Sequence, residues 1–334
     1  MKVLILRFSS IGDIVLTTPV IRCLKSKYPN AQIHYATKKS FRQIIDHNPY
    51  IDKIHVLDHS LLDLIKDLRA QKFDCVIDLH NNQRTFLIKL LLGVKTYSFN
   101  KINYLKWLMV KFKINRLPDK HIVQRYLEAC DALGVVDDGK GLDFFIEPTN
   151  EIKIDTLPHQ FQNGYISWVV GAKQKTKQFP VSKVVEVINS ELFPDKPIVL
   201  LGGKEDYNFA EEINKAVARS KNVLNACGKY SLAQSASLVK QSAAVITNDT
   251  GLMHIASAFH KPIVSIWGNT IPQFGMAPYK TNASVIEVNG LSCRPCSKLG
   301  YSECPQKHLK CMNMIKAQAI IDSLNAMIAN SGQL

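Results

Sequence analysis

The sequence predicts an α/β protein built from two doubly wound domains, each with a parallel β-sheet covered by helices. Short apolar runs alternate with helical segments along most of the chain, which is the pattern of repeated β-α-β units. The alternation is interrupted once, at residues 141–164, which are rich in Pro, Asn and Gly. A length of 334 residues also suits two domains of about 150 residues each.

The strands of each domain are predicted from short apolar runs bounded by turn signals. In the first half these runs cover residues 3–6, 33–37, 54–58, 75–80 and 96–99, and in the second half 165–170, 197–203, 222–228, 244–249 and 262–268. We expect an N-terminal domain at 1–155, a C-terminal domain at 156–311, and a final helix within 312–334 that packs back on the N-terminal domain. Two facing parallel sheets would place the carboxyl ends of their strands, and any ligand, in a cleft between them.

The composition is that of an ordinary globular protein, with 46% hydrophobic and 21% charged residues. No apolar run approaches the roughly 18 residues that a membrane-spanning helix needs. The start "MKVLILRFSS" carries Arg7 and lacks a small-residue cleavage site, so it predicts a first strand and not a signal peptide. We therefore expect a cytoplasmic protein whose eight cysteines are reduced.

The sharpest motif is "AVITNDTGLMHIASAFHKPIVSIWG", where a strand ends at Asp249 and a helix begins near Thr250. Free backbone N–H groups and the positive end of the helix dipole suit a phosphate or diphosphate at such a position. Gly251 would let the ligand approach the backbone, and His254 could hydrogen-bond a phosphate or ribose oxygen. The alternative is that the same residues form an N-terminal helix cap without any ligand.

Two further strand ends in the second half have chemistry that suits a nucleotide. The loop "VVGAKQKTKQFP" contains Gly171 and Ala172 followed by Lys173, Lys175 and Lys177, whose charges could neutralise a diphosphate leaving group. The alternative is a loop of solvated lysines. The run "VLLGGKEDYNFA" places Glu205 after two glycines, where a carboxylate could accept hydrogen bonds from ribose hydroxyls.

The pairing of "SSIGDIVLTTPVIRCLKSKYP" near the N-terminus with "NDTGLMHIASAFHKPIVSIWG" late in the chain resembles glycosyltransferase family 9. These are the ADP-heptose:lipopolysaccharide heptosyltransferases, and the resemblance covers essentially the whole chain. It implies a GT-B fold, with an acceptor-binding and a nucleotide-sugar-binding Rossmann-like domain. It also implies inverting transfer of a heptose or related sugar from an ADP-activated donor to the lipopolysaccharide inner core, without a catalytic metal ion.

The resemblance also assigns roles to residues. The family's catalytic aspartate falls on Asp13, which would remove the proton of the acceptor hydroxyl, although the same residue could simply cap a helix. Ser9, Ser10 and Gly12 would shape the turn that the acceptor approaches. The diphosphate-binding lysine matches Lys177, and the nucleotide motif matches Asp249, Thr250, Gly251 and His254. Glu205 is the nearest match to a ribose-binding glutamate, although the local spacing departs from the family pattern.

The net charge of +14 is unevenly distributed, because residues 79–118 contain eight basic residues and no Asp or Glu. Within them "KINYLKWLMVKFKINR" interleaves lysines with aromatic and aliphatic residues, which predicts an interfacial helix that meets anionic lipid or a phosphorylated glycolipid. The alternative is a solvated helix whose apolar face joins the core. We expect this stretch to bind the acceptor and to attach the protein peripherally to the cytoplasmic face of the inner membrane, and we expect no nucleic-acid partner. The residues expected to bind the acceptor are Arg84, Lys106, Lys111 and Lys113.

The cluster "CRPCSKLGYSECPQKHLKCM" places Cys293, Cys296, Cys304 and Cys311 in a C-x2-C-x7-C-x6-C pattern. Four thiolates so spaced could hold a structural zinc ion, and the alternative is a reduced, metal-free loop. The other four cysteines lie on apolar stretches and are predicted to be core residues.

Three other function classes remain open on the sequence. A nucleotide-sugar epimerase can share the two-domain architecture, but it would not need the basic, aromatic stretch. A dinucleotide oxidoreductase is disfavoured because "RFSSIGD" replaces the expected G-x-G-x-x-G turn. A non-catalytic lipid or nucleic-acid binder would leave the three nucleotide-type loops unused. A family member with a different nucleotide-sugar donor is a further alternative.

Overall fold

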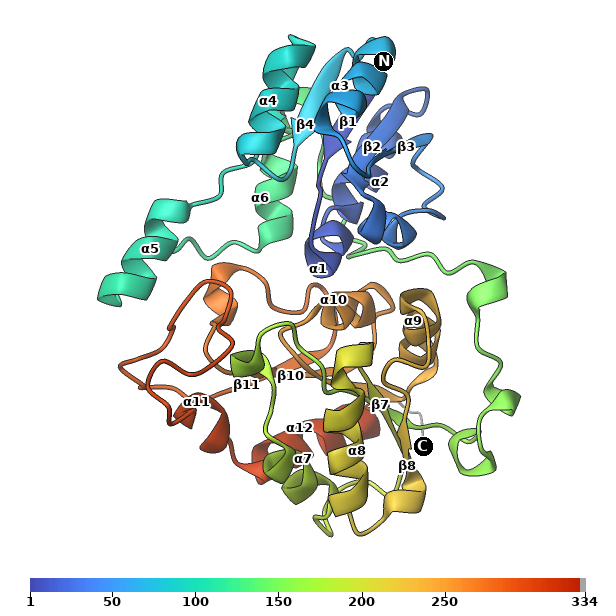
Figure 1. Ribbon diagram of the computed structural model, residues 1–334, viewed down its shortest axis with the longest axis vertical. Helices are drawn as coiled ribbons and strands as arrows, with labels where there is room; N and C mark the ends of the chain where they lie inside the picture. The colour runs from blue at the N-terminus through green and yellow to red at the C-terminus, as the bar shows by residue number, and fades with distance from the viewer. Residues whose placement is uncertain (331–334) are drawn as a thin grey trace. The chain divides into compact units, whose positions relative to one another are not determined.

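The computed structural model of the chain describes residues 1–330, whose contacts divide them into two compact units (Figure 1). Unit 1 contains Met1–Ile102 and Lys120–Phe145, and unit 2 contains Asn103–Asp119 and the chain from Ile146 onward. Each unit is built around one parallel sheet, so the predicted α/β class with two Rossmann-like, parallel-sheet domains is confirmed.

The sheet of unit 1 has the strand order β3-β2-β1-β4-β5, and every neighbouring pair is parallel. The strands are β1 (Lys2–Leu6), β2 (Gln32–Lys38), β3 (Lys53–Leu57), β4 (Cys75–Asp78) and β5 (Lys95–Ser98). The order reverses between β1 and β4, and ligands of such sheets bind outside the carboxyl ends of the strands at this switch point. The loops after β1 and β4 are therefore where a site is expected in unit 1.

The helices of unit 1 begin at polar caps that the sequence supplies. Ser60 accepts a hydrogen bond from the Asp63 amide at the start of α3, and Asn82 forms a capping box with Thr85 at the start of α4. Gly93 ends α4 in the left-handed conformation, with φ at +65°. The helices are α1 (Ile11–Val15), α2 (Thr18–Lys27), α3 (Leu61–Ala70), α4 (Gln83–Leu92) and α6 (Ile122–Glu128).

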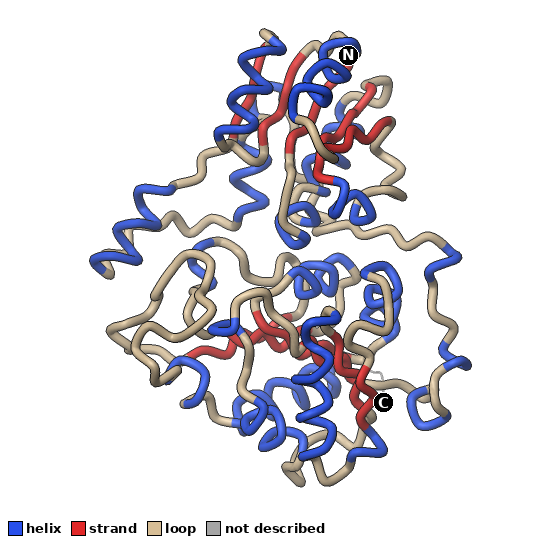
Figure 2. The backbone as a smooth tube through the Cα atoms, viewed as in Figure 1, coloured by secondary structure: helices blue, strands red, loops and turns tan. Residues whose placement is uncertain are grey.

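The sheet of unit 2 has the order β11-β10-β9-β6-β7-β8, again with parallel neighbours (Figure 2). The strands are β6 (Ile166–Val169), β7 (Ile198–Leu201), β8 (Val223–Asn225), β9 (Ala244–Asn248), β10 (Ile263–Trp267) and β11 (Ala283–Glu287). β6, β7, β9 and β10 are fully buried, because helices cover the sheet. The switch point of this sheet lies between β6 and β9.

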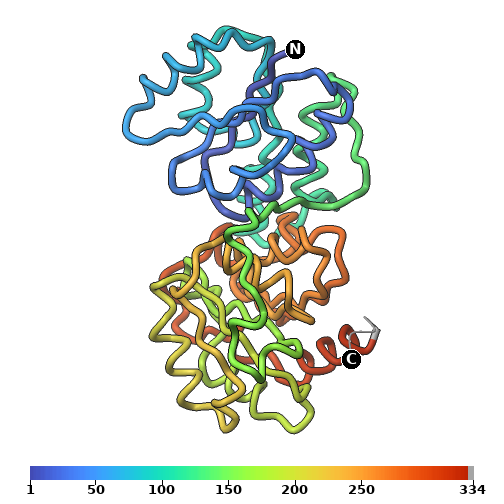
Figure 3. Tube along the Cα trace, turned by 90° about the vertical axis from the view of Figure 1, so that its right-hand side faces the viewer, coloured from blue at the N-terminus to red at the C-terminus, as the bar shows by residue number. Residues whose placement is uncertain are grey.

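Residues 146–165 precede β6 as an irregular segment with short 3-10 turns (Figure 3), which agrees with the loss of periodicity seen in the sequence. The helices of unit 2 are α5 (Asn103–Phe112), α7 (Val181–Ile188), α8 (Tyr207–Ala216), α9 (Leu232–Gln241), α10 (Gly251–Ala258), α11 (Lys310–Asn313) and α12 (Ala317–Asn330). Across residues 1–330, no helix is both long and apolar enough to cross a membrane.

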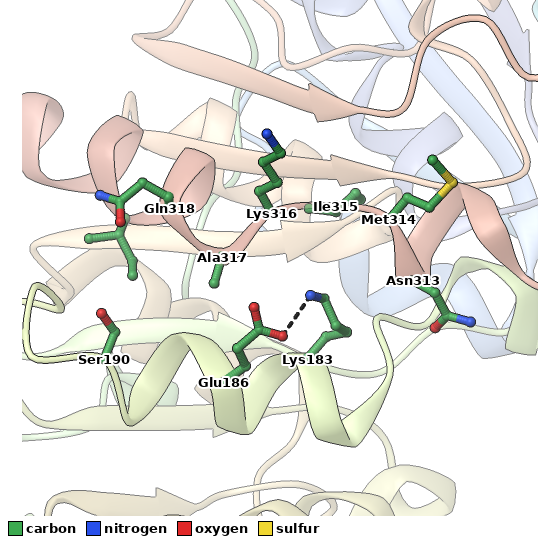
Figure 4. Close-up of a pocket in the computed structure, with 10 residues that line it drawn as sticks. Lys183, Glu186, Ser190, Asn313, Met314, Ile315, Lys316, Ala317 and Gln318 are labelled. Atoms are coloured by element: carbon green, nitrogen blue, oxygen red, sulfur yellow. Dashed lines mark hydrogen bonds and ion pairs between the residues drawn. The ribbon is translucent and has the colours of Figure 1, made fainter.

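The last helix differs from the expectation that it packs on the N-terminal domain. α12 buries Ile320, Ile321 and Leu324 in the core of unit 2, in contact with α7, β9, β10 and β11. The helix packs on unit 2 because the core of unit 2 covers its apolar face. A surface pocket of about 420 Å³ lies between α7 and residues 313–321, beside the ion pair of Lys183 and Glu186 (Figure 4), and no predicted site residue lines it.

The domain boundaries also differ from those expected at 155 and 156. The boundary of the units falls between Phe145 and Ile146, and residues 103–119, expected in the N-terminal domain, are assigned to unit 2. The reason lies in two contacts. The Lys113 ammonium donates to the Pro295 carbonyl at 2.7 Å, and the Lys106 ammonium lies 5.8 Å from the centre of the Phe274 ring.

Candidate active site

Asp13 lies on the first turn of α1, directly after the carboxyl end of β1. One of its oxygens accepts hydrogen bonds from the amide and the hydroxyl of Ser10, at 3.1 and 2.6 Å. Ser10 is the N-cap residue, and Asp13 is the third residue of the helix, so Asp13 supports the cap by bonding to Ser10 but is not itself the N-cap. Asp13 remains about a quarter exposed, so a substrate can still reach the carboxylate. The cap and a catalytic role are therefore compatible.

Arg7 completes the surroundings of Asp13 in unit 1. Its Nη2 lies 2.6 Å from Asp13 Oδ1, while Nη1 donates to the Leu79 carbonyl at 2.5 Å and to the Tyr126 hydroxyl at 2.8 Å. Burial lowers the pKa of Arg7, but Asp13, Tyr126 and Tyr35 together outweigh this effect and the pKa is raised overall. The permanently charged guanidinium therefore fixes the orientation of Asp13 from the protein side. Arg7 was not among the predicted site residues, and only its place two residues before Ser9 could have indicated it.

Two further residues occupy the loops at the carboxyl edge of unit 1. His80 follows β4 across the switch point from Asp13, and burial, followed by Arg7, lowers its pKa to about 4. The imidazole is therefore neutral near pH 7. His80 was not among the predicted site residues, because "CVIDLH" predicts only a strand. Arg84, predicted to bind the acceptor, lies with its guanidinium 5.4 Å from the centre of the Phe8 ring and so belongs to the same edge.

The predicted donor residues of unit 2 meet at the β6/β9 switch point. Lys177 lies in the 3-10 turn after β6, and its ammonium contacts Asp249 Oδ2 at 2.5 Å. The Thr270 hydroxyl, from the loop after β10, donates to the same oxygen at 3.0 Å. Both members of the ion pair are mostly buried, with 16% and 13% of their side chains exposed. Asp249 thus orients the lysine, which is a different role from direct contact with an anionic ligand.

The helix after β9 begins where the motif predicted. Thr250 is the N-cap of α10 and makes no side-chain cap bond, which leaves the N–H groups of the first turn, including that of Gly251, without a capping side chain. His254 is buried, with 2% of its surface exposed. Asn248 donates to the carbonyls of Val169 and Val170 and so ties the end of β9 to the end of β6.

The two neighbouring carboxylates after β7 lie in different environments. Glu205 is exposed, whereas its neighbour Asp206 is buried and accepts hydrogen bonds from the Gly203 amide at 2.9 Å and Gln178 Nε2 at 3.0 Å. Burial raises the pKa of Asp206. A Cβ at Gly171 would lie 2.0 Å from Asp206 Oδ2, so this glycine makes room for a carboxylate. Ala172, next to it, is half-buried.

The predicted acceptor lysines Lys106, Lys111 and Lys113 lie on or just after α5 and belong to unit 2, whereas Asp13 belongs to unit 1. The helix buries none of its residues. Tyr104 and Trp107 stack with ring centres 6.0 Å apart, and both rings are exposed. The predicted helix is confirmed, and none of its residues joins a core.

The four clustered cysteines all lie in unit 2, but they do not form a closed metal site. Zn–S bonds of about 2.3 Å require tetrahedral sulfurs roughly 3.8 Å apart. Within residues 1–330, the one group of three potential ligand atoms that lie within 4.8 Å of one another is Cys23, Asp137 and Asp138. Cys296 instead directs its thiol at the Cys293 carbonyl, at 3.1 Å. The remaining cysteines, Cys23, Cys75, Cys130 and Cys227, are buried and unpaired, as predicted.

Comparison with known proteins identifies the family. The family model described as glycosyltransferase family 9 (heptosyltransferase) matches residues 61–307. The chain belongs to glycosyltransferase family 9. Among curated members, it is 26% identical over 306 residues to lipopolysaccharide heptosyltransferase 1 of Campylobacter coli, covering 86% of this chain and 89% of that protein. Membership of glycosyltransferase family 9 makes the chain a glycosyltransferase and sets aside the epimerase, oxidoreductase and non-catalytic alternatives.

Solved structures share the fold of this family 9 chain. The glycosyl transferase family 9 from Veillonella parvula superposes with a TM-score of 0.80 at 23% identity, covering 98% of this chain and 97% of that one. The E. coli ADP-heptose lps heptosyltransferase II superposes with a TM-score of 0.74 at 21% identity, covering 99% of both chains. These likenesses extend over both domains of the family 9 enzyme.

Proposed function

We propose that the chain is an inverting heptosyltransferase, which moves a heptose or related sugar from an ADP-activated donor to a lipopolysaccharide inner-core acceptor. The observation that carries the proposal is the buried Lys177–Asp249–Thr270 cluster at the switch point of unit 2, beside the uncapped start of α10. This arrangement suits a diphosphate. The lipopolysaccharide heptosyltransferase of Campylobacter coli and the E. coli ADP-heptose lps heptosyltransferase II support the sugar, the nucleotide and the acceptor.

In the proposed reaction, Asp13 accepts the proton of the acceptor hydroxyl as its oxygen forms a bond to the anomeric carbon. The bond from that carbon to the donor's diphosphate oxygen breaks on the opposite face, and its electron pair leaves with the nucleoside diphosphate. Lys177 and the N–H groups at the start of α10 stabilise the negative charge that grows on the leaving group. The charge compensation therefore comes from the chain itself, and we propose that transfer needs no metal cofactor.

For the acceptor, we propose a phosphorylated glycolipid presented at the cytoplasmic face of the inner membrane, to which the enzyme attaches peripherally. α5 supports this proposal, because Tyr104, Trp107 and Phe112 are 67%, 48% and 54% exposed and no acidic residue occurs between residues 79 and 118. Exposed aromatic rings next to lysines are typical of helices that lie at an anionic membrane surface. Arg84, with Ser9, Ser10 and Gly12, remains proposed for the acceptor beside Asp13.

The structural zinc ion stays a proposal that metal analysis decides. A zinc ion bound by the four clustered cysteines would require their sulfurs to draw together, because no three of them lie within 4.8 Å of one another in the described chain. One zinc per chain in protein purified without chelator would establish the site. A zinc content near zero would leave a reduced, metal-free loop.

The test of the proposed function is a donor panel against truncated lipopolysaccharide acceptors, with the product sugar and its anomeric configuration read by mass spectrometry and NMR. Transfer from ADP-heptose with inversion supports the proposal. Transfer from a UDP- or GDP-sugar alone would show a family member with a different donor, and retention of configuration would contradict the mechanism. Nucleotide-sugar hydrolysis without an acceptor is the background control.

A further inference from the structure

The cysteine-rich loop, residues 291–311, bonds to backbone segments next to both residues of the Lys177–Asp249 ion pair. No step of the proposed transfer uses this loop. The loop joins β11 to α11 within unit 2. It approaches Asp249 through Arg294 and approaches Lys177 through the backbone of Tyr301. These two sets of contacts are independent of any metal ion in the loop.

Arg294 is the buried centre of the first set, with 5% of its side chain exposed. Its Nε donates to the Gly268 carbonyl at 2.6 Å, and its Nη2 donates to the Thr270 carbonyl at 2.8 Å. Glu287 balances the charge, with Oε2 at 2.5 Å from Nη2. A guanidinium presents its donors in a rigid plane, so bonds to two carbonyls of one short peptide fix the position of that peptide.

The peptide that Arg294 holds carries the hydroxyl that contacts Asp249. Thr270 Oγ1 donates to Asp249 Oδ2 at 3.0 Å, and the same oxygen contacts the Lys177 ammonium at 2.5 Å. The loop adds one more bond here, from the Cys296 amide to the Asn269 carbonyl at 3.0 Å. A displacement of this peptide would therefore move the group that orients the Asp249 carboxylate.

The second set of contacts holds the turn of Lys177. Thr176, which is buried, donates from its amide and its hydroxyl to the Tyr301 carbonyl at 3.1 and 3.0 Å, and its hydroxyl accepts from the Tyr301 amide at 2.8 Å. Close packing accompanies these bonds, because a Cβ at Gly300 would lie 2.8 Å from the Gln174 Cβ and Gly300 has φ at +105°. The loop thus fixes the backbone from which Lys177 projects.

We propose that loop 291–311 is the positioning element of the diphosphate site, and that Arg294 is a positioning residue for binding a nucleoside diphosphate. The inference rests on the proposed function, because it takes the diphosphate to bind at Lys177. A long lysine side chain loses rotamer freedom when it binds a ligand. An Asp249 carboxylate that is held in one position already restricts the Lys177 side chain, so the entropy cost of binding the ligand is smaller. Arg294 acts through Thr270 and Asp249, without contact to the ligand.

The test is a double-mutant cycle with ADP as the probe, its Kd measured by calorimetry. Arg294→Met and Thr270→Val should each raise the Kd for ADP by about tenfold, and the double variant should show little more than the larger single effect, because both changes break one chain of contacts. Arg294→Lys should restore little, since a compact ammonium lacks the planar, spread donors with which the guanidinium bonds both carbonyls. Arg219→Met, which removes a partly exposed arginine elsewhere in unit 2, is the matched control.

A steady-state measurement separates positioning from general destabilisation. Arg294→Met should raise the KM for the donor sugar nucleotide and leave the KM for the acceptor unchanged, at a temperature where circular dichroism shows a folded protein. Thr176→Val, which removes the hydroxyl bonds to Tyr301 and keeps the amide bond, supplies a milder variant if Arg294→Met does not fold, and it should raise the Kd for ADP. Wild-type ADP affinity in these variants, or additive effects in the cycle, would overturn the inference. Failure of the wild type to bind ADP would instead count against the proposed donor, and the cycle would then use the nucleotide that the wild type binds.

Discussion

Arg7 and Asp13 form a short ion pair at the carboxyl edge of unit 1, with Nη2 of the arginine 2.6 Å from Oδ1 of the aspartate. The other oxygen of Asp13 accepts from Ser10, so one oxygen is oriented by a buried cation and the other by the helix cap. This arrangement gives the carboxylate one defined orientation toward a substrate. A general base must be held in place before its proton affinity matters, because proton transfer occurs only at hydrogen-bond distance.

Replacing Asp13 by Asn should lower turnover by about 100-fold or more while the Kd for the donor nucleotide stays nearly unchanged. The amide keeps the shape of the side chain but accepts no proton, and the donor residues lie in the other unit. Single-turnover rates and calorimetric nucleotide binding check the prediction. A folded Asp13→Asn protein with near-normal turnover would reduce Asp13 to a helix cap.

Replacing Arg7 by Lys should lower kcat by about tenfold without changing the KM for the donor. Arg7 contacts Asp13, Leu79 and Tyr126 with donors that are spread over a rigid plane, and the compact ammonium of a lysine does not reproduce this geometry. A misplaced base slows the chemical step. Arg69→Lys, at an exposed position in α3, is the matched control. Unchanged kcat in a folded Arg7→Lys protein would show that the ion pair contributes only to stability.

Replacing Lys177 by Ala should raise the Kd for ADP by about tenfold or more, because the change removes a cation and leaves the Asp249 carboxylate to repel the diphosphate. Lys175→Ala, which removes an exposed lysine from the same 3-10 turn, should have little effect. Calorimetric titration of both variants measures the difference. Equal affinity in the two variants would move the diphosphate away from Lys177.

Treatment with EDTA should leave the rate of transfer unchanged, since Lys177 and the start of α10 are proposed to carry the charge of the leaving group. The measurement compares initial rates with EDTA, without addition, and after a return of Mg²⁺. A rate that disappears with EDTA and returns with Mg²⁺ would contradict the metal-free mechanism.

Periodicity was sufficient to predict the alternation of strands and helices, because parallel strands covered by helices are continuous apolar runs and their helices begin at polar caps. It also placed Lys177 in the loop after one predicted strand and Asp249 at the end of another, while the resemblance to glycosyltransferase family 9 distinguished Lys177 from the other lysines of its loop. Their direct contact could not be predicted, because the order of β6 and β9 in the sheet is a tertiary property. Arg7 was missed for the same reason, as its partners Leu79 and Tyr126 are distant in sequence.

Two sequence expectations depend on contacts that the sequence does not specify. The final helix pattern does not say which apolar surface will cover it, and the core of unit 2 covers Ile320 and Leu324. The spacing of the four cysteines suited zinc, but spacing leaves the direction of each thiol open, and Cys296 is directed at a backbone carbonyl. The same loop contains Arg294, whose importance appears only when its carbonyl partners are known.

The stability of unit 1 should fall as the pH is lowered from 6.5 toward 4. His34 Nδ1 lies 2.9 Å from His55 Nε2, and the pKa of His34 is lowered to about 4 by burial first, then by His55, Lys2 and Lys53, against a smaller opposite effect of Asp52. Between the pKa of about 4 in the folded protein and 6.5 in the unfolded chain, the unfolded chain binds more protons at His34. The free energy of unfolding therefore decreases by at most about 1.4 kcal/mol for each pH unit that the pH is lowered in this range.

Urea denaturation at pH 7 and pH 5 checks this prediction. His34→Gln should reduce the dependence of the unfolding free energy on pH, because it removes one of the unit 1 histidines whose pKa is lowered by burial. His55 and His80, whose pKa values are also lowered, should keep the remainder. His59→Gln is the control, since the side chain of His59 is 91% exposed. The same slope in wild type and His34→Gln would assign the acid sensitivity to other groups.

Replacing Lys106 and Lys111 by Gln should weaken binding to anionic vesicles and raise the KM for a lipid-linked acceptor, with the KM for the donor unchanged. Lys113 is kept, because its bond to Pro295 ties α5 to the cysteine-rich loop. Electrostatic attractions between exposed charges are screened within about 8 to 10 Å at 0.1 to 0.15 M ionic strength. Vesicle binding by the variant should therefore also depend less on the salt concentration. Gln at the exposed Lys215 and Lys221 makes the same change of charge elsewhere in unit 2 and should have no effect. If the α5 variant keeps wild-type vesicle binding and acceptor kinetics, this helix is only a solvated surface helix. The acceptor would then bind only at the loops around Asp13 and Arg84.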